Sequence, residues 1–126
     1  MLLVDSDVLI WYMRGNERAY DFIEGLAGFS ISVITYMELV QGMRNKRELY
    51  KLRQSLHRWN ARIVYLTEEI SAKAMFFVEQ RYLSHSVEIA DALIGASAVA
   101  CGFPLLTGND KHYKAMSGVE IKKFSP

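Results

Sequence analysis

Short apolar runs alternate along this 126-residue chain with longer segments in which hydrophobic residues recur at helical spacing. Short runs rich in β-branched residues predict strands, and hydrophobic residues three and four positions apart predict helices. We expect strands at 2–5, 29–33, 62–65 and 103–107, with a fifth at 119–121. We expect helices at 6–14, from the Gly15–Asn16 break to about 26, and at 35–43, 47–59, 67–82 and 87–101.

Strands that alternate with helices predict an α/β fold in which a parallel sheet is covered on both faces. The expected architecture is a three-layer α/β/α arrangement around a central parallel sheet of four to five strands. No internal repeat, low-complexity tract or linker divides the chain. Its length is sufficient for one hydrophobic core, so residues 1–126 are expected to form a single domain.

The amino-acid composition indicates what class of protein this is and where in the cell it is expected. Hydrophobic residues make up 51% of the chain and charged residues 23%, which is an ordinary globular balance. The one cysteine, Cys101, excludes an intramolecular disulfide and a zinc cluster built from thiolates. The N-terminus lacks the basic region of a signal peptide, and no apolar run approaches the ~20 residues needed to span a bilayer. We therefore expect a cytoplasmic protein with no membrane partner.

Four acidic residues stand in otherwise apolar surroundings: Asp5, Glu38, Asp91 and Asp110. A buried carboxylate is costly unless a cation or a hydrogen-bond donor meets it. Asp5 follows the first expected strand, and open α/β sheets bind their ligands at the carboxyl ends of the strands. Oxygen ligands gathered there from distant parts of the chain suit a hard divalent cation, so we expect Mg²⁺ or Mn²⁺.

These acids also have structural interpretations. Asp5 or Asp7 can cap the helix that begins near residue 6, although one cap does not explain both residues. Thr35 and Glu38 match the capping-box spacing, which would assign Glu38 to the start of its own helix. Asp91 lies in a helix that is apolar nearly all round, where the alternative to a ligand is a buried salt bridge to an arginine.

The segment after the fourth expected strand supplies further polar side chains. Asn109 and Asp110 compete for a turn or cap position and for the place of a fourth ligand. Thr107, at the end of the strand, is placed to hydrogen-bond a carboxylate of the site or a water molecule. None of the three histidines has a partner at metal-ligand spacing, which argues against a histidine-based zinc site.

A local basic patch interrupts an otherwise balanced charge distribution. The net charge of +1 gives no overall attraction to nucleic acid, so such binding would need a patch of this kind. Basic residues are concentrated between Arg44 and Arg62, relieved only by Glu48. The patch is either the solvated face of a helix or a surface for a nucleic-acid backbone. In the second case the contacts are expected from Arg44, Lys46, Arg47 and Lys51.

Four segments, in order along the chain, resemble the motifs of the PIN-domain ribonucleases and, within that family, of VapC-type toxins from toxin–antitoxin pairs. The segments are 3–10 (LVDSDVLI), 35–42 (TYMELVQG), 91–98 (DALIGASA) and 105–113 (LLTGNDKHY). Each motif is weak by itself. Four of them in sequence, on the expected elements and over a chain of matching length, are specific.

The resemblance implies a PIN-like α/β/α fold, cleavage of RNA with Mg²⁺ or Mn²⁺, a homodimer and inhibition by a VapB-like antitoxin. Asp5, Glu38 and Asp91 match the three core acids of the family. Members often place a fourth acid where this chain has Asn109, with Asp110 next to it, so either residue can complete the site.

A mechanism follows as a hypothesis. Asp5 and Asp91 are expected to be the principal metal ligands, and Ser6 is expected to hydrogen-bond a ligand or a phosphate. Glu38 is expected either to bridge to the metal or to lie behind its ligands, and to orient the attacking water. Because acids packed together without a metal repel one another, at least one of them should have a raised pKa. The expected catalytic residues are Asp5, Glu38, Asp91 and Asp110, supported by Ser6, Thr107 and Asn109.

Two other functions fit parts of the sequence. Asp5-Ser6-Asp7 imitates the DxD nucleophile motif of haloacid-dehalogenase phosphatases, but Leu9 stands where that motif has Thr or Val, and the chain is short for a core plus a cap. The third hypothesis is a non-catalytic domain of the same fold that binds a partner helix in an apolar groove. The groove would be formed by Trp11, Tyr12, Met13, Met37, Met43 and Trp59.

Overall fold

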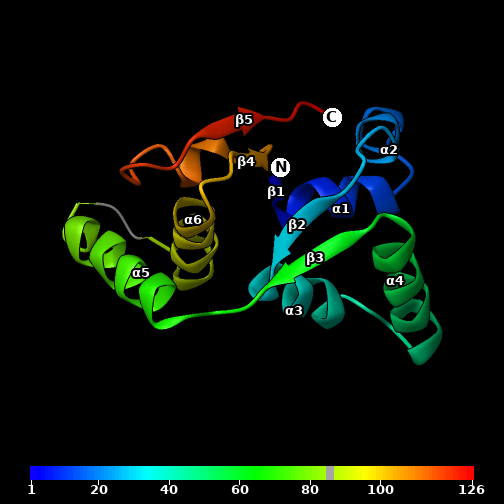
Figure 1. The fold of residues 1–126 in the computed structure, drawn as a ribbon, viewed down its shortest axis with the longest axis horizontal. Helices are drawn as coiled ribbons and strands as arrows, with labels where there is room; N and C mark the ends of the chain where they lie inside the picture. The colour runs from blue at the N-terminus through cyan, green and yellow to red at the C-terminus, as the bar shows by residue number, and fades with distance from the viewer. Residues whose placement is uncertain (85–86) are drawn as a thin grey trace.

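The computed structural model describes residues 1–84 and 87–126, and its elements follow the expected order (Figure 1). Within these residues the strands are β1 (Leu3–Val4), β2 (Phe29–Ser32), β3 (Ala61–Val64), β4 (Leu105–Thr107) and β5 (Ile121–Lys123). The helices are α1 (Ser6–Met13), α2 (Glu17–Glu24), α3 (Val33–Gln41), α4 (Lys46–Arg58), α5 (Glu68–Arg81) and α6 (Ile89–Cys101), with the short 3-10 helix η1 (Asp110–His112) after β4.

The strands form one parallel sheet in the order β3-β2-β1-β4-β5. β1 is the central strand, and its Leu3 pairs with Ser30 of β2 on one side and with Leu105 of β4 on the other. The chain builds outward from β1 to β3 and then returns to place β4 and β5 on the opposite side. The strand order therefore reverses between β1 and β4, which is where α/β sheets open a crevice for ligands.

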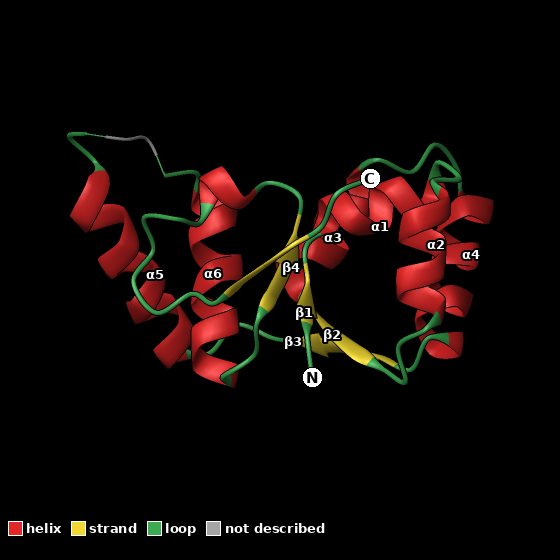
Figure 2. Cartoon of the chain, turned by 90° about the horizontal axis from the view of Figure 1, so that it is seen from above, coloured by secondary structure: helices red, strands yellow, loops and turns green. Residues whose placement is uncertain are grey.

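Helices cover both faces of the sheet, which confirms the expected three-layer α/β/α architecture (Figure 2). α1, α2 and α4 lie on one face, whereas α5 and α6 lie on the other. The buried side chains divide accordingly, with Leu9, Ile23 and Leu56 in one cluster and Phe77 and Ile94 in the other. Burying one such side chain stabilises a fold by about 1.5–3 kcal/mol, so both clusters hold their helices firmly against the sheet.

Several element boundaries differ from expectation by one or two residues, and the start of α3 bears on the site. α3 begins at Val33 because the Ser32 side chain accepts a hydrogen bond from the backbone N–H of Ile34 at 3.0 Å. Thr35 consequently lies inside the helix and is fully buried, so the capping-box interpretation of Thr35 and Glu38 is wrong. The last strand, β5, lies two residues later than the expected 119–121.

Two further expectations concern a membrane-spanning helix and the apolar groove for a partner. No helix in the described part of the chain is long and apolar enough to cross a membrane. Met13 and Met37, expected in a partner groove, are exposed. Trp59, expected in the same groove, is instead buried. Its ring stands edge-on to Tyr12, and its indole N–H donates to Glu24 at 3.1 Å.

Candidate active site

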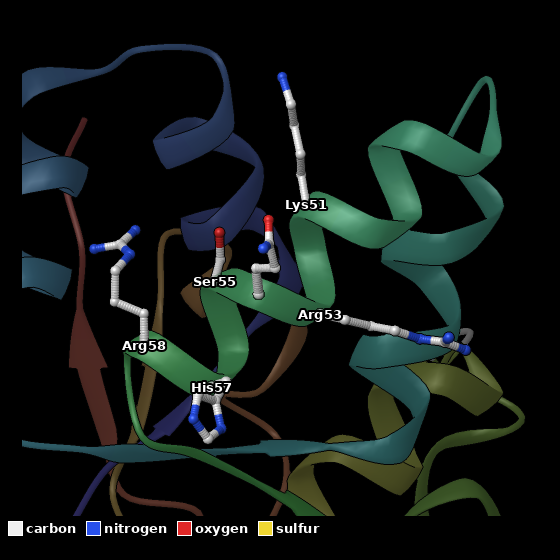
Figure 3. A pocket seen from close by; sticks show the side chains of 6 residues that line it. Lys51, Arg53, Ser55, His57 and Arg58 are labelled. Carbon is white, nitrogen blue, oxygen red and sulfur yellow. The ribbon is translucent and has the colours of Figure 1, made fainter.

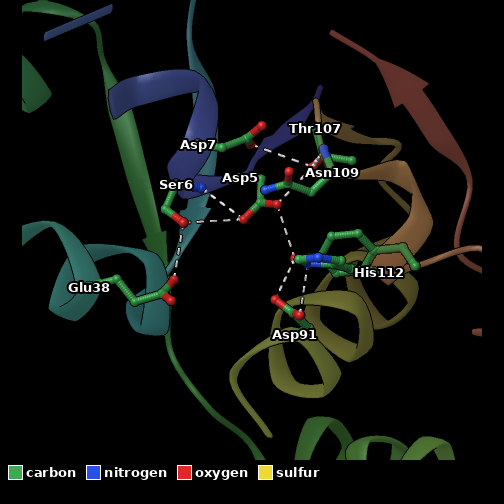
Figure 4. Close-up of polar contacts among 9 residues, drawn as sticks. Asp5, Ser6, Asp7, Glu38, Asp91, Thr107, Asn109 and His112 are labelled. Carbon is green, nitrogen blue, oxygen red and sulfur yellow. Dashed lines mark hydrogen bonds and ion pairs between the residues drawn. The ribbon is translucent and has the colours of Figure 1, made fainter. Parts of the chain in front are cut away.

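Polar side chains from separate elements meet at the carboxyl edge of the sheet, beside the reversal between β1 and β4 (Figure 4). Asp5 directly follows β1, and Thr107 is the last residue of β4. Glu38 comes from α3, and Asp91 comes from the first turn of α6. α6 leads back to the start of β4, so its own first turn lies at the same edge as the ends of the strands. The fold thus brings together three acids that are far apart in the sequence.

Asp5 is the most enclosed of these acids, with only 3% of its surface exposed. Its Oδ1 accepts a hydrogen bond from the Ser6 backbone N–H at 2.8 Å, which caps α1. Its Oδ2 accepts from the Thr107 hydroxyl at 2.8 Å and lies 3.1 Å from the Tyr113 hydroxyl. Capping is therefore one contact of Asp5 among several, and these donors fix the orientation of its carboxylate.

Two hydroxyl groups connect Asp5 to the other acids. The Ser6 hydroxyl lies 3.2 Å from Glu38 Oε1 and 3.5 Å from Asp5 Oδ1. The Tyr113 hydroxyl lies between Asp5 Oδ2, at 3.1 Å, and Asp91 Oδ1, at 3.3 Å. A hydroxyl carries one proton, so each can donate to only one carboxylate at a time. Burial and the two neighbouring carboxylates raise the pKa of Tyr113, which keeps its phenol protonated as a donor.

The cluster carries negative charge that nearby cations do not balance. Among residues 1–84 and 87–126, no lysine or arginine forms an ion pair with Asp5, Asp7, Glu38 or Asp91. Burial, followed by the charge of Asp5, raises the pKa of Asp7 from 3.8 to about 6. Burial is also the main cause of the raised pKa values of Glu38 and Asp91, and the charge of Asp5 adds to both. The expected repulsion among the acids is therefore present.

The side chains of the site are of the types that bind a hard cation, although their oxygen atoms do not converge on one point. No three histidine, cysteine or acidic side chains in the described segments already converge on one point that could hold an ion. The hydroxyls of Ser6 and Tyr113 stand between the carboxylates. Three properties of the site suit a divalent cation. Its ligating atoms are carboxylate oxygens, their charges interact in a partly buried crevice, and no lysine or arginine of the described residues is paired with them.

Asp7 contributes to the site in a way that the sequence did not indicate. Its Oδ2 accepts a hydrogen bond from the backbone N–H of Gly108 at 2.8 Å, and its Oδ1 lies 3.5 Å from the Thr107 hydroxyl. A Cβ at position 108 would lie 2.6 Å from Asp7 Oδ2, so this close approach requires glycine. Asp7 therefore ties the first turn of α1 to the end of β4, next to the bond between Thr107 and Asp5.

Asp110 does not join the other acids, contrary to expectation. Its carboxylate binds the ammonium group of Lys114 at 3.2 Å and also that of Lys123. These two hydrogen bonds lower the pKa of Asp110 to about 2. Asn109 remains close to the site, because its backbone N–H donates to the Thr107 hydroxyl at 2.9 Å. The structure therefore favours Asn109 over Asp110 as the polar residue beside Thr107.

Asp91 has a different partner from the arginine considered in the sequence. Its Oδ2 lies 3.1 Å from Nδ1 of His112, a residue that follows β4 in the short helix η1 (Figure 4). The sequence did not point to Tyr113, the next residue, which is fully buried and reaches both Asp5 and Asp91. Its neighbours in the sequence, from Asn109 to Lys114, are polar and typical of an exposed turn, so the local pattern gave no signal that this phenol is buried in the site.

The basic patch lies largely on α4 and does not converge on the acids. Lys46 and Arg47 are exposed, and Arg44 forms an ion pair with Glu48 at 3.0 Å. Arg44 also lines a cavity of about 620 Å³ that includes Glu38. Lys51 lines a separate cavity of about 710 Å³ on α4, where the cationic side chains point in different directions (Figure 3).

Comparison with known proteins identifies the family. The sequence model of the PIN-domain family matches residues 2–118. Ribonuclease VapC10 of Mycobacterium tuberculosis is 34% identical over 119 residues, covering 90% of this chain and 86% of the relative. Ribonuclease VapC1 of Methanocaldococcus jannaschii is 28% identical over 124 residues, covering 98% of this chain and 86% of the relative.

A solved structure gives independent support for the fold. VapBC2 from Rickettsia felis, bound to a DNA fragment from its promoter, contains a chain that superposes with a TM-score of 0.84. The two chains are 18% identical, and the match covers 98% of each. The strand order, the acids at the switch point and the family match agree, and the chain belongs to the PIN-domain family.

Proposed function

We propose that the protein is a metal-dependent endoribonuclease of VapC type that hydrolyses phosphodiester bonds in RNA and is neutralised by a VapB-like antitoxin. The observation that carries this proposal is the meeting of Asp5, Glu38 and Asp91 around two hydroxyl groups, with no lysine or arginine paired to them in the described residues. The relatives named as ribonucleases support the activity. Residues 1–126 are proposed to act as one domain, in the cytoplasm.

Asp5 and Asp91 are proposed as the principal ligands of Mg²⁺, or of Mn²⁺ in its place, with Glu38 bridging to the metal through the water that it orients. A divalent cation held here would act as a Lewis acid, making a water molecule more acidic and offsetting the negative charge that develops on the phosphate. Asp5 is held for this task by the Ser6 N–H and by the hydroxyls of Thr107 and Tyr113.

Glu38 is proposed to orient the attacking water and to accept its proton. Burial raises the pKa of this carboxyl, which makes it a better proton acceptor than an ordinary glutamate. The Ser6 hydroxyl, 3.2 Å from Oε1, positions one oxygen of Glu38 and leaves the other for the water. Thr107 and Asn109 support the site from the end of β4.

The exposed cations of α4 remain the proposed contact for the RNA backbone outside the catalytic crevice. Replacing Lys46, Arg47 and Lys51 together with alanine should weaken cleavage and reduce its dependence on salt, because lysine and arginine contacts to phosphates release counterions. Unchanged kinetics in this triple variant would remove α4 from the RNA-binding surface.

A VapB-like partner fits the apolar cavity next to Glu38. Ile10, Met13, Leu39 and Met43 line it, together with the charged residues Arg14, Arg44 and Glu48. Such a lining suits an amphipathic segment whose apolar side chains enter while its polar side meets the charged rim. The structural neighbour VapBC2 supports this class of partner. A homodimer is also proposed, and light scattering of the purified protein measures it.

The deciding experiment is the cleavage of end-labelled cellular RNA by antitoxin-free protein. The reaction is run with Mg²⁺, with Mn²⁺ and with EDTA, beside an Asp91→Asn variant. Discrete cuts that require metal and disappear in the variant are expected. Identical patterns from the variant and the wild type would show that a contaminating nuclease makes the cuts, and would refute the assignment.

The same experiment addresses the alternatives. Membership of the PIN family argues against the phosphatase hypothesis, which requires Asp7 as an acid, whereas Asp7 is bonded to Gly108 and Thr107. A folded protein that binds an antitoxin but neither binds metal nor cuts RNA would be the non-catalytic domain. In that case neutralising Asp5 and Asp91 would leave antitoxin binding unchanged.

A further inference from the structure

A cavity of about 450 Å³ opens beside the carboxylate cluster and shares Asp91 with it. Its other lining residues include Lys111, His112 and Lys114, from η1 and the turn after it. The volume lies within the range of cavities that take one ligand of small-molecule size. A group bound in this space, here called the Asp91 cavity, would therefore lie next to the reacting centre.

Its polar lining combines two lysines and the His112 ring with the carboxyl groups of Glu88 and Asp91. Lys114 lines the cavity while its ammonium group lies 3.2 Å from the carboxylate of Asp110, which also binds Lys123. Lys111 is exposed in the same turn. The His112 side chain is 52% exposed, while its Nδ1 is fixed 3.1 Å from Asp91 Oδ2. The ring is therefore oriented and still accessible.

We propose that the Asp91 cavity binds one unpaired nucleotide of the RNA substrate, adjacent to the phosphate that is cut. Its base packs against the His112 ring and its phosphate meets Lys111 and Lys114. Unpaired bases in RNA commonly stack on aromatic side chains, histidine included, and lysines hold the phosphates. A base within a duplex cannot reach such a cavity, so a single strand should bind at this site more tightly than a duplex. This inference rests on the proposed ribonuclease function.

The same inference gives Asp110 a role other than catalysis. It is a positioning residue, because its carboxylate contacts Lys114 and Lys123 and no other acid of the site. Asp110→Asn should therefore raise the KM for RNA and leave kcat close to the wild-type value, whereas loss of a catalytic acid would lower kcat.

Binding is measured in an Asp5→Asn background, so that the probe is not cut. The probe is a fluorescein-labelled random-sequence 20-nucleotide RNA, as a single strand and as a duplex, followed by fluorescence anisotropy. His112→Ala should raise the Kd for the single strand about fivefold or more, the scale of one lost base–aromatic stack. His112→Phe should restore the Kd because it keeps an aromatic face. Lys73→Ala, on α5, is the matched control for loss of a lysine outside the cavity.

The lysines are tested by salt dependence. Lys111→Ala combined with Lys114→Ala should reduce the slope of log Kd against log salt by about one per lost phosphate contact. Equal affinity for the duplex, or unchanged Kd in both the His112→Ala and the double lysine variants, would overturn the inference. Equal loss in His112→Ala and His112→Phe would also overturn it, since the ring would then serve only to orient Asp91.

Cleavage kinetics separate this inference from the proposed function. If the unmodified protein cuts no RNA with either metal, the ribonuclease proposal fails and this inference fails with it. If it cuts RNA, and the His112→Ala and lysine variants retain the wild-type KM, only the nucleotide site is refuted. A raised KM that His112→Phe reverses supports both.

Discussion

Replacing Asp7 with asparagine should make the metal-free protein more stable at neutral pH. Burial and the charge of Asp5 raise the pKa of Asp7 from 3.8 to about 6. Asparagine removes the charge, and its side-chain oxygen can still accept the hydrogen bond that Gly108 donates at 2.8 Å. The substitution therefore removes a repulsion while retaining the contact between α1 and the end of β4.

The sign and size of the effect follow from proton linkage. In the unfolded chain this carboxyl ionises near its ordinary pKa of 3.8, whereas in the folded protein it remains protonated up to about pH 6. Between these values the folded state binds more protons, so stability falls as the pH rises. One pKa unit corresponds to about 1.4 kcal/mol, so the difference between 3.8 and about 6 amounts to about 3 kcal/mol at most.

The assay is urea unfolding in EDTA from pH 4 to pH 8, for the wild type and Asp7→Asn. The free energy of unfolding of the variant, minus that of the wild type, should grow by up to about 3 kcal/mol between pH 4 and pH 7. Taking the difference removes the titration of groups that both proteins share. Asp21→Asn, which removes an exposed carboxylate from α2, is the matched control. A difference that does not change with pH would refute the account of Asp7.

Three further outcomes are expected. Thr107→Val should destabilise the protein by about 1.5–3 kcal/mol in thermal or urea unfolding and slow RNA cleavage, because a buried donor 2.8 Å from Asp5 is lost; Thr107→Ser should restore both. Gly108→Ala should lower the free energy of unfolding by about 1–3 kcal/mol, because the added Cβ would lie 2.6 Å from Asp7 Oδ2. A double-mutant cycle should show a smaller loss of stability when Asp7 is already alanine. Millimolar Mg²⁺ or Mn²⁺ should raise the Tm of the wild type and not that of Asp5→Asn, and an unchanged wild-type Tm would exclude a metal site.

The fold was predictable because its signals are local. The hydrophobic pattern that indicates the strand before Asp5, and the one that indicates the helix around Asp91, are each visible within a few neighbouring residues. The acids of the cluster were predictable for a related reason, since a carboxylate in an apolar segment requires a partner wherever the fold places it. The start of α3 was misjudged because Ser32 and Thr35 are both good caps, and the sequence alone does not decide between them.

The contacts between segments were not predictable from local pattern. Asp7 and Gly108 are 101 positions apart, and their hydrogen bond depends on the parallel register of β1 and β4. Asp110 was expected among the acids because it follows the strand that ends at Thr107, but its carboxylate instead binds Lys114 and Lys123, the latter on the distant strand β5. The hydrogen bond of Asp7 and the ion pairs of Asp110 depend on how distant segments pack across the sheet, which no short stretch of sequence determines.

The pairing of the central strand with β4 has a consequence for the protein during its own synthesis. Leu3 pairs with Leu105, and Asp5 accepts a hydrogen bond from Thr107, so the site combines one segment with another that is synthesised 102 positions later. A nascent chain that has not yet reached β4 lacks both the sheet order and the donors that fix Asp5. A protein that cuts cellular RNA would therefore remain inert on the ribosome that makes it, and fragments ending before residue 105 should be harmless to the cell.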